Sequence, residues 1–177
     1  MKKLFALSVF VLAMVFSTDA TAQQFSGLDK SPADMAAHPS SYKNSKKNIR
    51  VIYSRPQLKG RLVNDLAPEG KVWRTGANEA VEITFYGNTT FGGKNIKAGT
   101  YSLFTIPGSK EWTVILNSNL NQWGAYSYDK SGDVARVSGK VSKGEESLEA
   151  FSITFTDTAM VMGWGTTLVS VPFAIPE

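Results

Sequence analysis

From Ile49 onward the chain consists of short runs in which apolar and polar residues alternate, with Gly, Pro, Asn and Asp between the runs. Alternation with a period of two is typical of β-strands that bury one face. Val81, Ile83 and Phe85, for example, share one face, whereas Glu82 lies on the other. The predicted strands are Ile49–Ser54, Ala80–Tyr86, Thr89–Phe91, Lys94–Ile96, Thr100–Ile106, Trp112–Asn117, Val134–Val141, Leu148–Thr156, Ala159–Trp164 and Thr167–Phe173.

This pattern contains no helix of three turns, so it predicts an all-β domain. One apolar face per strand indicates antiparallel sheets that cover each other. We therefore expect a single antiparallel β-sandwich of Greek-key or jelly-roll type over residues 48–177. The run Thr100–Ile106 is apolar on both faces and should be a central strand.

Residues 23–47 are polar and small, and we expect them to lead into the domain. Ser31 as N-cap, Pro32 at the first helical position and Asp34 in the first turn predict one short helix that ends at Pro39. His38 lies in this segment without a second histidine beside it, which favours a solvated residue at the helix end over a ligand or base.

Residues 1–22 have the pattern of a secretory signal peptide. Lys2 and Lys3 precede the apolar run Leu4–Phe16, and a small-residue cleavage pattern ends at Ala22. The run is shorter than the roughly 20 residues that a membrane-spanning helix needs, and we expect no membrane insertion. Cleavage after Ala22 predicts a periplasmic or secreted product of residues 23–177, which is the usual size of one domain.

The composition excludes several classes of chemistry. The chain has no cysteine and one histidine, so disulfides, thiolate catalysis and zinc or iron sites with Cys or several His ligands are not expected. A Ser-His-Asp triad would have to use His38, and no G-x-S-x-G motif exists. The net charge is +4 without a run of five or more like charges, which does not favour nucleic-acid binding. We expect no metal and no cofactor.

Two long connections depart from the hairpin spacing: the segment from Arg55 to Gly76 and the segment from Ser118 to Asp133. Both combine aromatic, amide and charged side chains, and loops of this length in compact domains are often functional. We expect them to converge at one end of the sandwich, where they form either a lid or a ligand site. The candidate ligand-binding residues are Arg55, Trp73, Arg74, Asn78, Glu79, Gln122, Trp123, Tyr126 and Tyr128.

Some of these residues have structural alternatives. Arg74 and Glu79 flank a tight turn, and Arg74 could either hold the connection through a carboxylate or the backbone, or bind a ligand. Trp73 and Trp123 could stack on a ligand, or both could close the end of the core. Asp129, Ser131 and Asp133 could offer oxygen ligands to calcium, but a hairpin turn is favoured.

Glycoside hydrolysis would require two carboxylates that face one gap. Glu79 could be paired with Glu82, Glu111 or Asp129. Glu79 and Glu82 are expected on opposite faces of one strand, so this pair is not predicted to act together.

Several motifs together resemble the domain of unknown function 2911 family of exported proteins of Gram-negative bacteria. They are YSRP (53–56), KGR (59–61), GKVWRTGANEA (70–80), AGTYSLFTIPG (98–108) and NQWGAYSYD (121–129), and the resemblance extends from about Ser31 to the C-terminus. It implies a signal peptide followed by one β-rich domain, and it implies no reaction, ligand or cofactor.

These observations favour an exported binding module of the cell envelope whose ligand is a small molecule, a glycan or a peptide. Two alternatives remain open: a carboxylate-type enzyme that acts on glycans, and a protein-interaction or assembly module. No catalytic constellation is recognisable, so an enzyme is the less favoured class. The oligomeric state is left open.

The signal-peptide interpretation predicts that the mature chain begins at Gln23. Intact-mass spectrometry of the protein from its native cells checks this expectation. Recovery of an uncleaved chain that begins at Met1 would contradict export.

Overall fold

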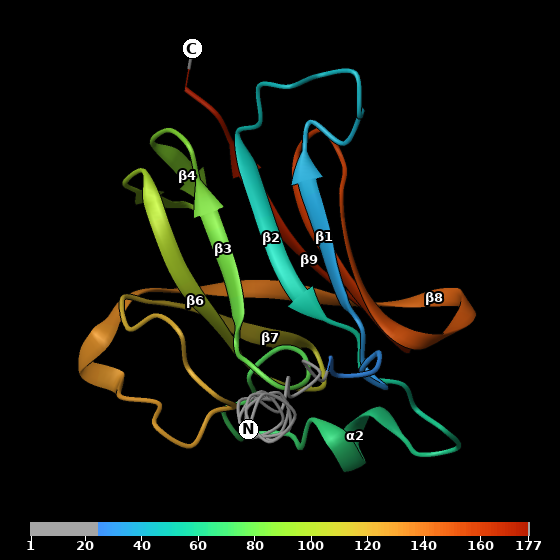
Figure 1. Ribbon diagram of the computed structural model, residues 1–177. Coiled ribbons are helices and arrows are strands. Elements are labelled where there is room, and N and C mark those ends of the chain that lie inside the picture. Colours follow the sequence, from blue (N-terminus) through green and yellow to red (C-terminus); the bar gives the residue numbers. More distant parts are fainter. Residues whose placement is uncertain (1–24, 177) are drawn as a thin grey trace, which may run out of the picture.

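The computed structural model describes residues 25–176, and the predicted signal peptide lies outside them. Within these residues, nine strands form one antiparallel sheet in the order β1-β2-β3-β6-β7-β8-β9-β4-β5 (Figure 1). The strands are β1 (Ala33–His38), β2 (Ile49–Ser54), β3 (Val81–Phe85), β4 (Thr89–Phe91), β5 (Lys94–Ile96), β6 (Gly99–Ile106), β7 (Glu111–Asn117), β8 (Asp133–Phe155) and β9 (Ala159–Ala174). The helical elements are α2 (Val63–Leu66) and the 3₁₀ turn η1 (Lys130–Gly132).

The all-β class and the antiparallel pairing are confirmed, but a sandwich of two separate sheets is not. The sheet is continuous because β8 and β9 are each longer than the two strands predicted in their place. Both bend without breaking. The register of β8 against β9 shifts between Lys143 and Ser152, and Gly165 has a φ of 55°, a left-handed value that glycine adopts without strain.

The short helix predicted between Ser31 and Pro39 is wrong, because this segment contains strand β1. All six residues of β1 pair with β2, from Ala33 opposite Ser54 to His38 opposite Ile49. The pairing with a distant strand outweighs the local helix-start signals. His38 is likewise not a solvated helix end: its partly buried ring packs edge-on against Phe173, with a centroid distance of 4.8 Å.

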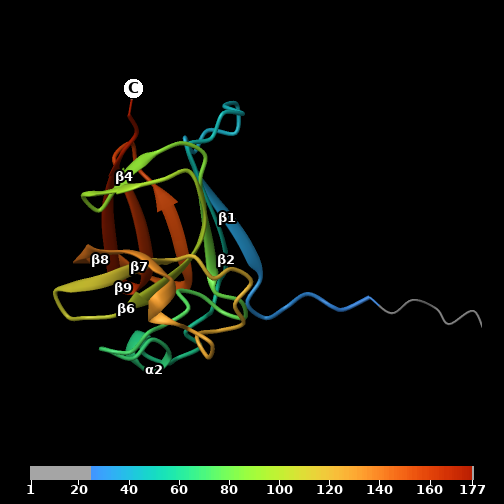
Figure 2. The same cartoon turned by 90° about the vertical axis from the view of Figure 1, so that its left-hand side faces the viewer.

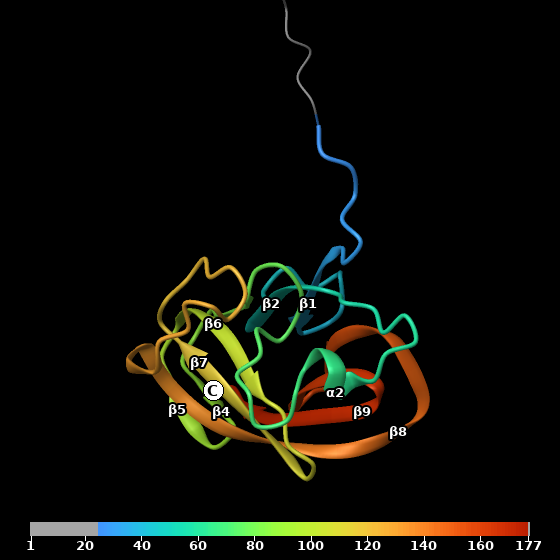
Figure 3. The same cartoon turned by 90° about the horizontal axis from the view of Figure 1, so that it is seen from below.

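The sheet curls around a single main core, and the connection that contains α2 lies across one end of it (Figure 3). The alternation predicted for β3, β7 and β8 is confirmed: Ile83, Val114 and Phe151 are all buried in this core. After α2, the same connection also supplies the buried Trp73, whose backbone pairs with Thr105 of β6. The chain at residues 25–30 runs away from the sheet (Figure 2).

Strand β6 is central, as its two apolar faces predicted, and lies between β3 and β7. Leu103 faces the main core, whereas Phe104 faces the other side of the sheet. There the Ser118–Asp133 connection covers it with Ala125 and Tyr128, in a second small cluster. The outer face of the sheet is therefore covered over β6 and β7 and open over β1 to β3.

The curl brings the end of β2 against the second half of β8, along a contact that we name the seam (residues 53–58 with 149–153). Gln57 and Ala150 form an isolated antiparallel β-bridge. The Tyr53 hydroxyl accepts a 3.0 Å hydrogen bond from the N–H of Ile153 and lies 3.2 Å from Asp34 Oδ2. Arg55 donates to Phe151 O, Ser152 Oγ and Asp34 Oδ2 at distances of 3.1, 2.7 and 3.2 Å. Side chains thus join strands that are not neighbours in the sheet order.

Within residues 25–176, no helix has the length and apolar character needed to cross a membrane.

The seam makes the Tyr53 hydroxyl a determinant of stability. Tyr53→Phe leaves the buried N–H of Ile153 without its acceptor, so we expect a loss of about 1–3 kcal/mol in the free energy of unfolding, measured with urea. Tyr42 is 90% exposed, and Tyr42→Phe is the control that should stay within about 0.5 kcal/mol of wild type. Equal stability of the two variants would contradict the role of the seam.

The same hydroxyl predicts a loss of stability in alkali. Burial raises the pKa of Tyr53 above its ordinary value of 10.0, so the folded state holds the phenolic proton more tightly than the unfolded state. This contribution is present below about pH 10 and is lost as the pH rises through the higher folded pKa. Urea unfolding at several pH values above 9 should show a shallower decline in Tyr53→Phe than in wild type. A decline of equal slope would contradict the assignment.

Candidate functional site

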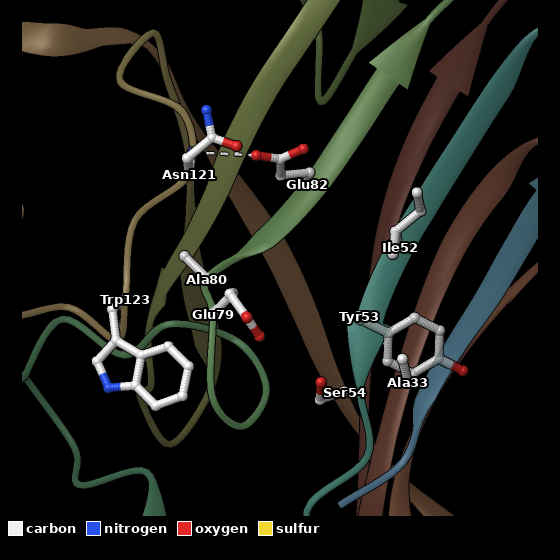
Figure 4. Close-up of a pocket in the computed structure, with 9 residues that line it drawn as sticks. All are labelled: Ala33, Ile52, Tyr53, Ser54, Glu79, Ala80, Glu82, Asn121 and Trp123. Carbon is white, nitrogen blue, oxygen red and sulfur yellow. Dashed lines mark hydrogen bonds between the residues drawn. The ribbon is translucent and has the colours of Figure 1, made fainter. Parts of the chain in front are cut away.

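An open groove of about 450 Å³ lies on the outer face of β2 and β3, beside the edge of the Ser118–Asp133 connection (Figure 4). Strand alternation supplies its floor. Ile52 of β2 lies opposite Glu82 of β3, and both side chains point away from the core. The lining residues are Ala33, Ile52, Tyr53, Ser54, Glu79, Ala80, Glu82, Asn121 and Trp123.

One wall of the groove is built where the residues that follow Gly76 meet the Ser118–Asp133 connection. Glu79 and Trp123 form an isolated antiparallel bridge. On either side of it, Ala80 N–H donates to Gln122 O at 2.8 Å and Gly124 N–H donates to Asn78 O at 3.0 Å. These main-chain bonds fix the position of the Trp123 backbone relative to β3.

Local backbone conformation explains why this wall carries asparagines. Asn78 and Asn121 have positive φ values of 60° and 57°. Asn tolerates the left-handed region better than most residues. Each asparagine therefore turns the chain directly before the paired segment, and Trp123 is left 62% exposed beside the groove.

Two carboxylates line the same groove, which corrects the expectation that Glu79 and Glu82 lie on opposite faces. Strand β3 begins only at Val81, and the turn at Asn78 breaks the alternation before Glu79. Glu82 Oε1 accepts a 3.1 Å hydrogen bond from the N–H of Asn121. Glu79 is exposed and has no hydrogen-bond or ion-pair partner for its carboxylate within residues 25–176.

Trp73 is part of the core and not of the groove. It is 6% exposed and stacks on Trp164 at a centroid distance of 5.5 Å and an interplanar angle of 11°. Its ring also meets Trp112 and Phe151 edge-on. The two tryptophans were expected either both to stack on a ligand or both to close the core. Instead, Trp73 is buried in the core and Trp123 is exposed.

Arg55 and Tyr128 also lie outside the groove lining, and each makes hydrogen bonds that join two segments of the fold. Arg55 donates hydrogen bonds across the seam to Phe151 and Ser152 of β8. Tyr128 donates to Asp133, at 2.8 Å from Oδ2, and accepts a 2.6 Å hydrogen bond from Arg136 Nη2. Burial, and then the adjacent Asp133 carboxylate, raise the pKa of Tyr128. Tyr128 thereby anchors the Ser118–Asp133 connection to β8.

Arg74 holds the backbone and not the carboxylate of Glu79. Its Nε donates to Gly76 O at 3.2 Å, two residues along the same turn. Gln122 is also locally engaged, since its Nε2 donates to Leu120 O at 2.9 Å. Arg74 and the 85% exposed Tyr126 line a different, smaller pocket.

The Asp-rich turn at the end of the connection is a capped 3₁₀ turn. Asp129 accepts from the N–H and the hydroxyl of Ser131, at 2.9 and 2.6 Å. Asp133 is occupied by Arg136, at 2.7 Å. In the described part of the chain no three His, Cys, Asp or Glu side chains are grouped as a metal site would require.

Sequence reasoning missed Ile52 and set aside Glu82. A signal for Ile52 is present: β2 has the order Ile49-Arg50-Val51-Ile52-Tyr53, so an apolar residue stands on the face that also carries Arg50. Ile52 is 54% exposed, as is its cross-strand neighbour Met35. Exposed apolar residues that line a concave surface are typical of ligand sites.

The fold and the groove define an antiparallel β-domain with an open groove on the outer face of its sheet. The chain belongs to the family described as Protein of unknown function (DUF2911), whose model matches residues 31–173. Comparison with curated proteins and with solved structures finds no match to either.

The four tryptophans give a direct test of the site geometry. Trp73, Trp112 and Trp164 are at most 6% exposed, whereas Trp123 is 62% exposed. Iodide should quench a single class of tryptophan fluorescence, and Trp123→Phe should remove that quenchable fraction.

Trp73→Phe is the matched control and should keep the quenchable fraction of wild type. It should also lower the free energy of unfolding, because it leaves a gap between Trp112 and Trp164. Loss of quenching in the Trp73 variant, with none in the Trp123 variant, would contradict this arrangement.

Proposed function

We propose that this protein is exported to the cell envelope and binds a glycan in the groove beside Trp123. The exposed indole carries the proposal. Aromatic side chains offer a flat apolar face on which a sugar ring can stack, while polar groups at the rim hydrogen-bond its hydroxyls. Glu79, Glu82 and Asn121 surround Trp123 in this way.

The strand pairing favours a glycan over a peptide. Extended peptides commonly bind by adding a strand to an open sheet edge. The floor of the groove is formed by β2, which pairs with β1 and β3, and by β3, which pairs with β2 and β6. From Ile49 to Ile52, β2 pairs with β3 residue by residue, so a ligand over this part of the floor must be recognised through side chains.

The charge of the groove lining indicates which kinds of sugar would bind best. Its ionisable side chains are the two glutamates and the largely buried Tyr53, and no Lys or Arg lines it. Carboxylates accept hydrogen bonds from hydroxyls but repel anions. A neutral or amine-bearing sugar fits this lining better than a uronic acid does.

A glycan-cleaving enzyme is the second candidate, because Glu79 and Glu82 line one groove. Against it, one oxygen of Glu82 holds the backbone of Asn121. A protein interface is favoured less, because the surface is concave and carries free polar groups.

Binding is tested on an array of neutral, amine-bearing and acidic oligosaccharides, followed by calorimetry with the best ligand. Trp123→Ala should weaken binding by about ten-fold or more, since each 1.4 kcal/mol of lost stacking corresponds to ten-fold. Tyr126→Ala removes a more exposed ring of the same connection, outside the groove, and serves as the control. Binding by Trp123→Ala at wild-type strength would refute the site.

Glu79→Gln separates binding from catalysis. Its carboxylate has no protein partner within residues 25–176, so the fold should be unchanged and affinity should fall by roughly three- to ten-fold through one lost charged hydrogen bond. The same oligosaccharides, incubated with wild type and analysed by mass spectrometry, should remain intact. Hydrolysis in wild type that Glu79→Gln abolishes would instead establish the enzyme.

A further inference from the structure

A second pocket has a volume of about 290 Å³. It is lined in part by Ala125 and Tyr126, which follow Gly124 on the same connection that carries Trp123. Its lining residues are Leu66, Pro68, Lys71, Val72, Trp73, Arg74, Ala125 and Tyr126. It shares none of these with the groove. The pocket lies where the chain between α2 and Arg74 meets the Ser118–Asp133 connection.

The floor of this pocket is apolar and its charged groups are cations. Leu66, Val72 and Ala125 are partly buried, while Lys71 is exposed at the rim. No carboxylate lines the pocket. The lining is therefore opposite in charge to the groove.

Both cations are available to a ligand. The salt bridges within residues 25–176 involve Arg55 and Arg136, so Lys71 and Arg74 are not neutralised by an acidic partner. Arg74 uses Nε to bind Gly76 O, which orients the guanidinium and leaves its Nη groups without a protein acceptor in the described residues. A guanidinium held in this way is suited to bind a carboxylate or a phosphate.

Tyr126 adds a flat wall beside the guanidinium. Gly124 has a φ of 69°, and a Cβ at this position would meet the Tyr126 ring at 2.7 Å and lie 3.6 Å from Arg74 Nη1. The ring thus packs on the bare glycine backbone next to Arg74. Its outward side remains free, because Tyr126 is 85% exposed.

We propose that this pocket is a second binding site, for a small molecule with a flat apolar body and an anionic head. Arg74 and Lys71 bind the head, which is a carboxylate or a phosphate monoester. The apolar body lies on Val72 and Ala125 against the ring of Tyr126. The site is independent of glycan binding in the groove, because the two linings have no residue in common.

The test is a titration followed by ¹H–¹⁵N NMR on protein purified from cells that express the full chain. The probes are benzoate, phenyl phosphate and the uncharged benzyl alcohol. Both anions should shift the amide signals of residues 71–74 and 124–126, and benzyl alcohol should bind at least ten-fold more weakly. The tighter of the two anions identifies the head group.

The variants separate a built site from general attraction of anions to a basic protein. Arg74→Gln should weaken both anions at least ten-fold, and Lys71→Gln, at an exposed position that the fold does not need, should weaken them three-fold or more. Lys130→Gln removes the same charge from the Ser118–Asp133 connection, outside the pocket, and should bind as wild type. The proposal is overturned if the anions shift no signals in these segments, if benzyl alcohol binds equally well, or if Lys130→Gln weakens binding as much as Lys71→Gln.

Discussion

The arrangement of this protein depends on the seam between the end of β2 and the second half of β8. Nine strands in one sheet could form an open, twisted surface, and a single apolar face would then remain in water. The hydroxyl of Tyr53 and the guanidinium of Arg55 instead hold β2 against the backbone of β8. Because the seam fixes the curl, the inner faces of β3, β7 and β9 enclose one core, and the outer face of β1 to β3 is left for the groove.

Most strands could be predicted because the alternation that marks them is local in sequence. That these strands form one continuous, curled sheet could not be predicted in this way. Alternation placed Val81, Ile83 and Phe85 correctly in the core. It could not show that β8 continues through residues 142–147, because exposed edges of a bent strand and a turn have similar composition. The segment around Met35 was misassigned for a related reason: its helix-start signals are local, but its fate is set by pairing with Ile52 and other residues of a distant strand.

The candidate site could be located but not resolved from sequence. The two long connections do meet, where Arg74 lies beside Gly124, and the bridge of Glu79 with Trp123 comes directly after the first of them. Which tryptophan faces water depends on packing: Trp73 enters a cluster with Trp112 and Trp164 that only the curled sheet creates. Residue type alone cannot distinguish a ring that fills the core from a ring that meets a ligand.

The meeting of the connections also explains why the predicted site residues line two separate pockets. Gly124 is buried, and its N–H is bound to Asn78 O. The chain passes close to the sheet here, so the side chains before and after Gly124 enter separate cavities. The ionisable side chains that line the groove with Trp123 are carboxylates apart from the buried Tyr53 phenol, and the charged side chains that line the pocket with Tyr126 are cations. Hydrogen bonds on either side of Trp123 already fix the backbone there, so a ligand at either proposed site requires little ordering of this segment, and this lowers the entropic cost of binding. In our proposals, the charge on each side of Gly124 selects the ligand, because the aromatic surface itself differs little between the two cavities.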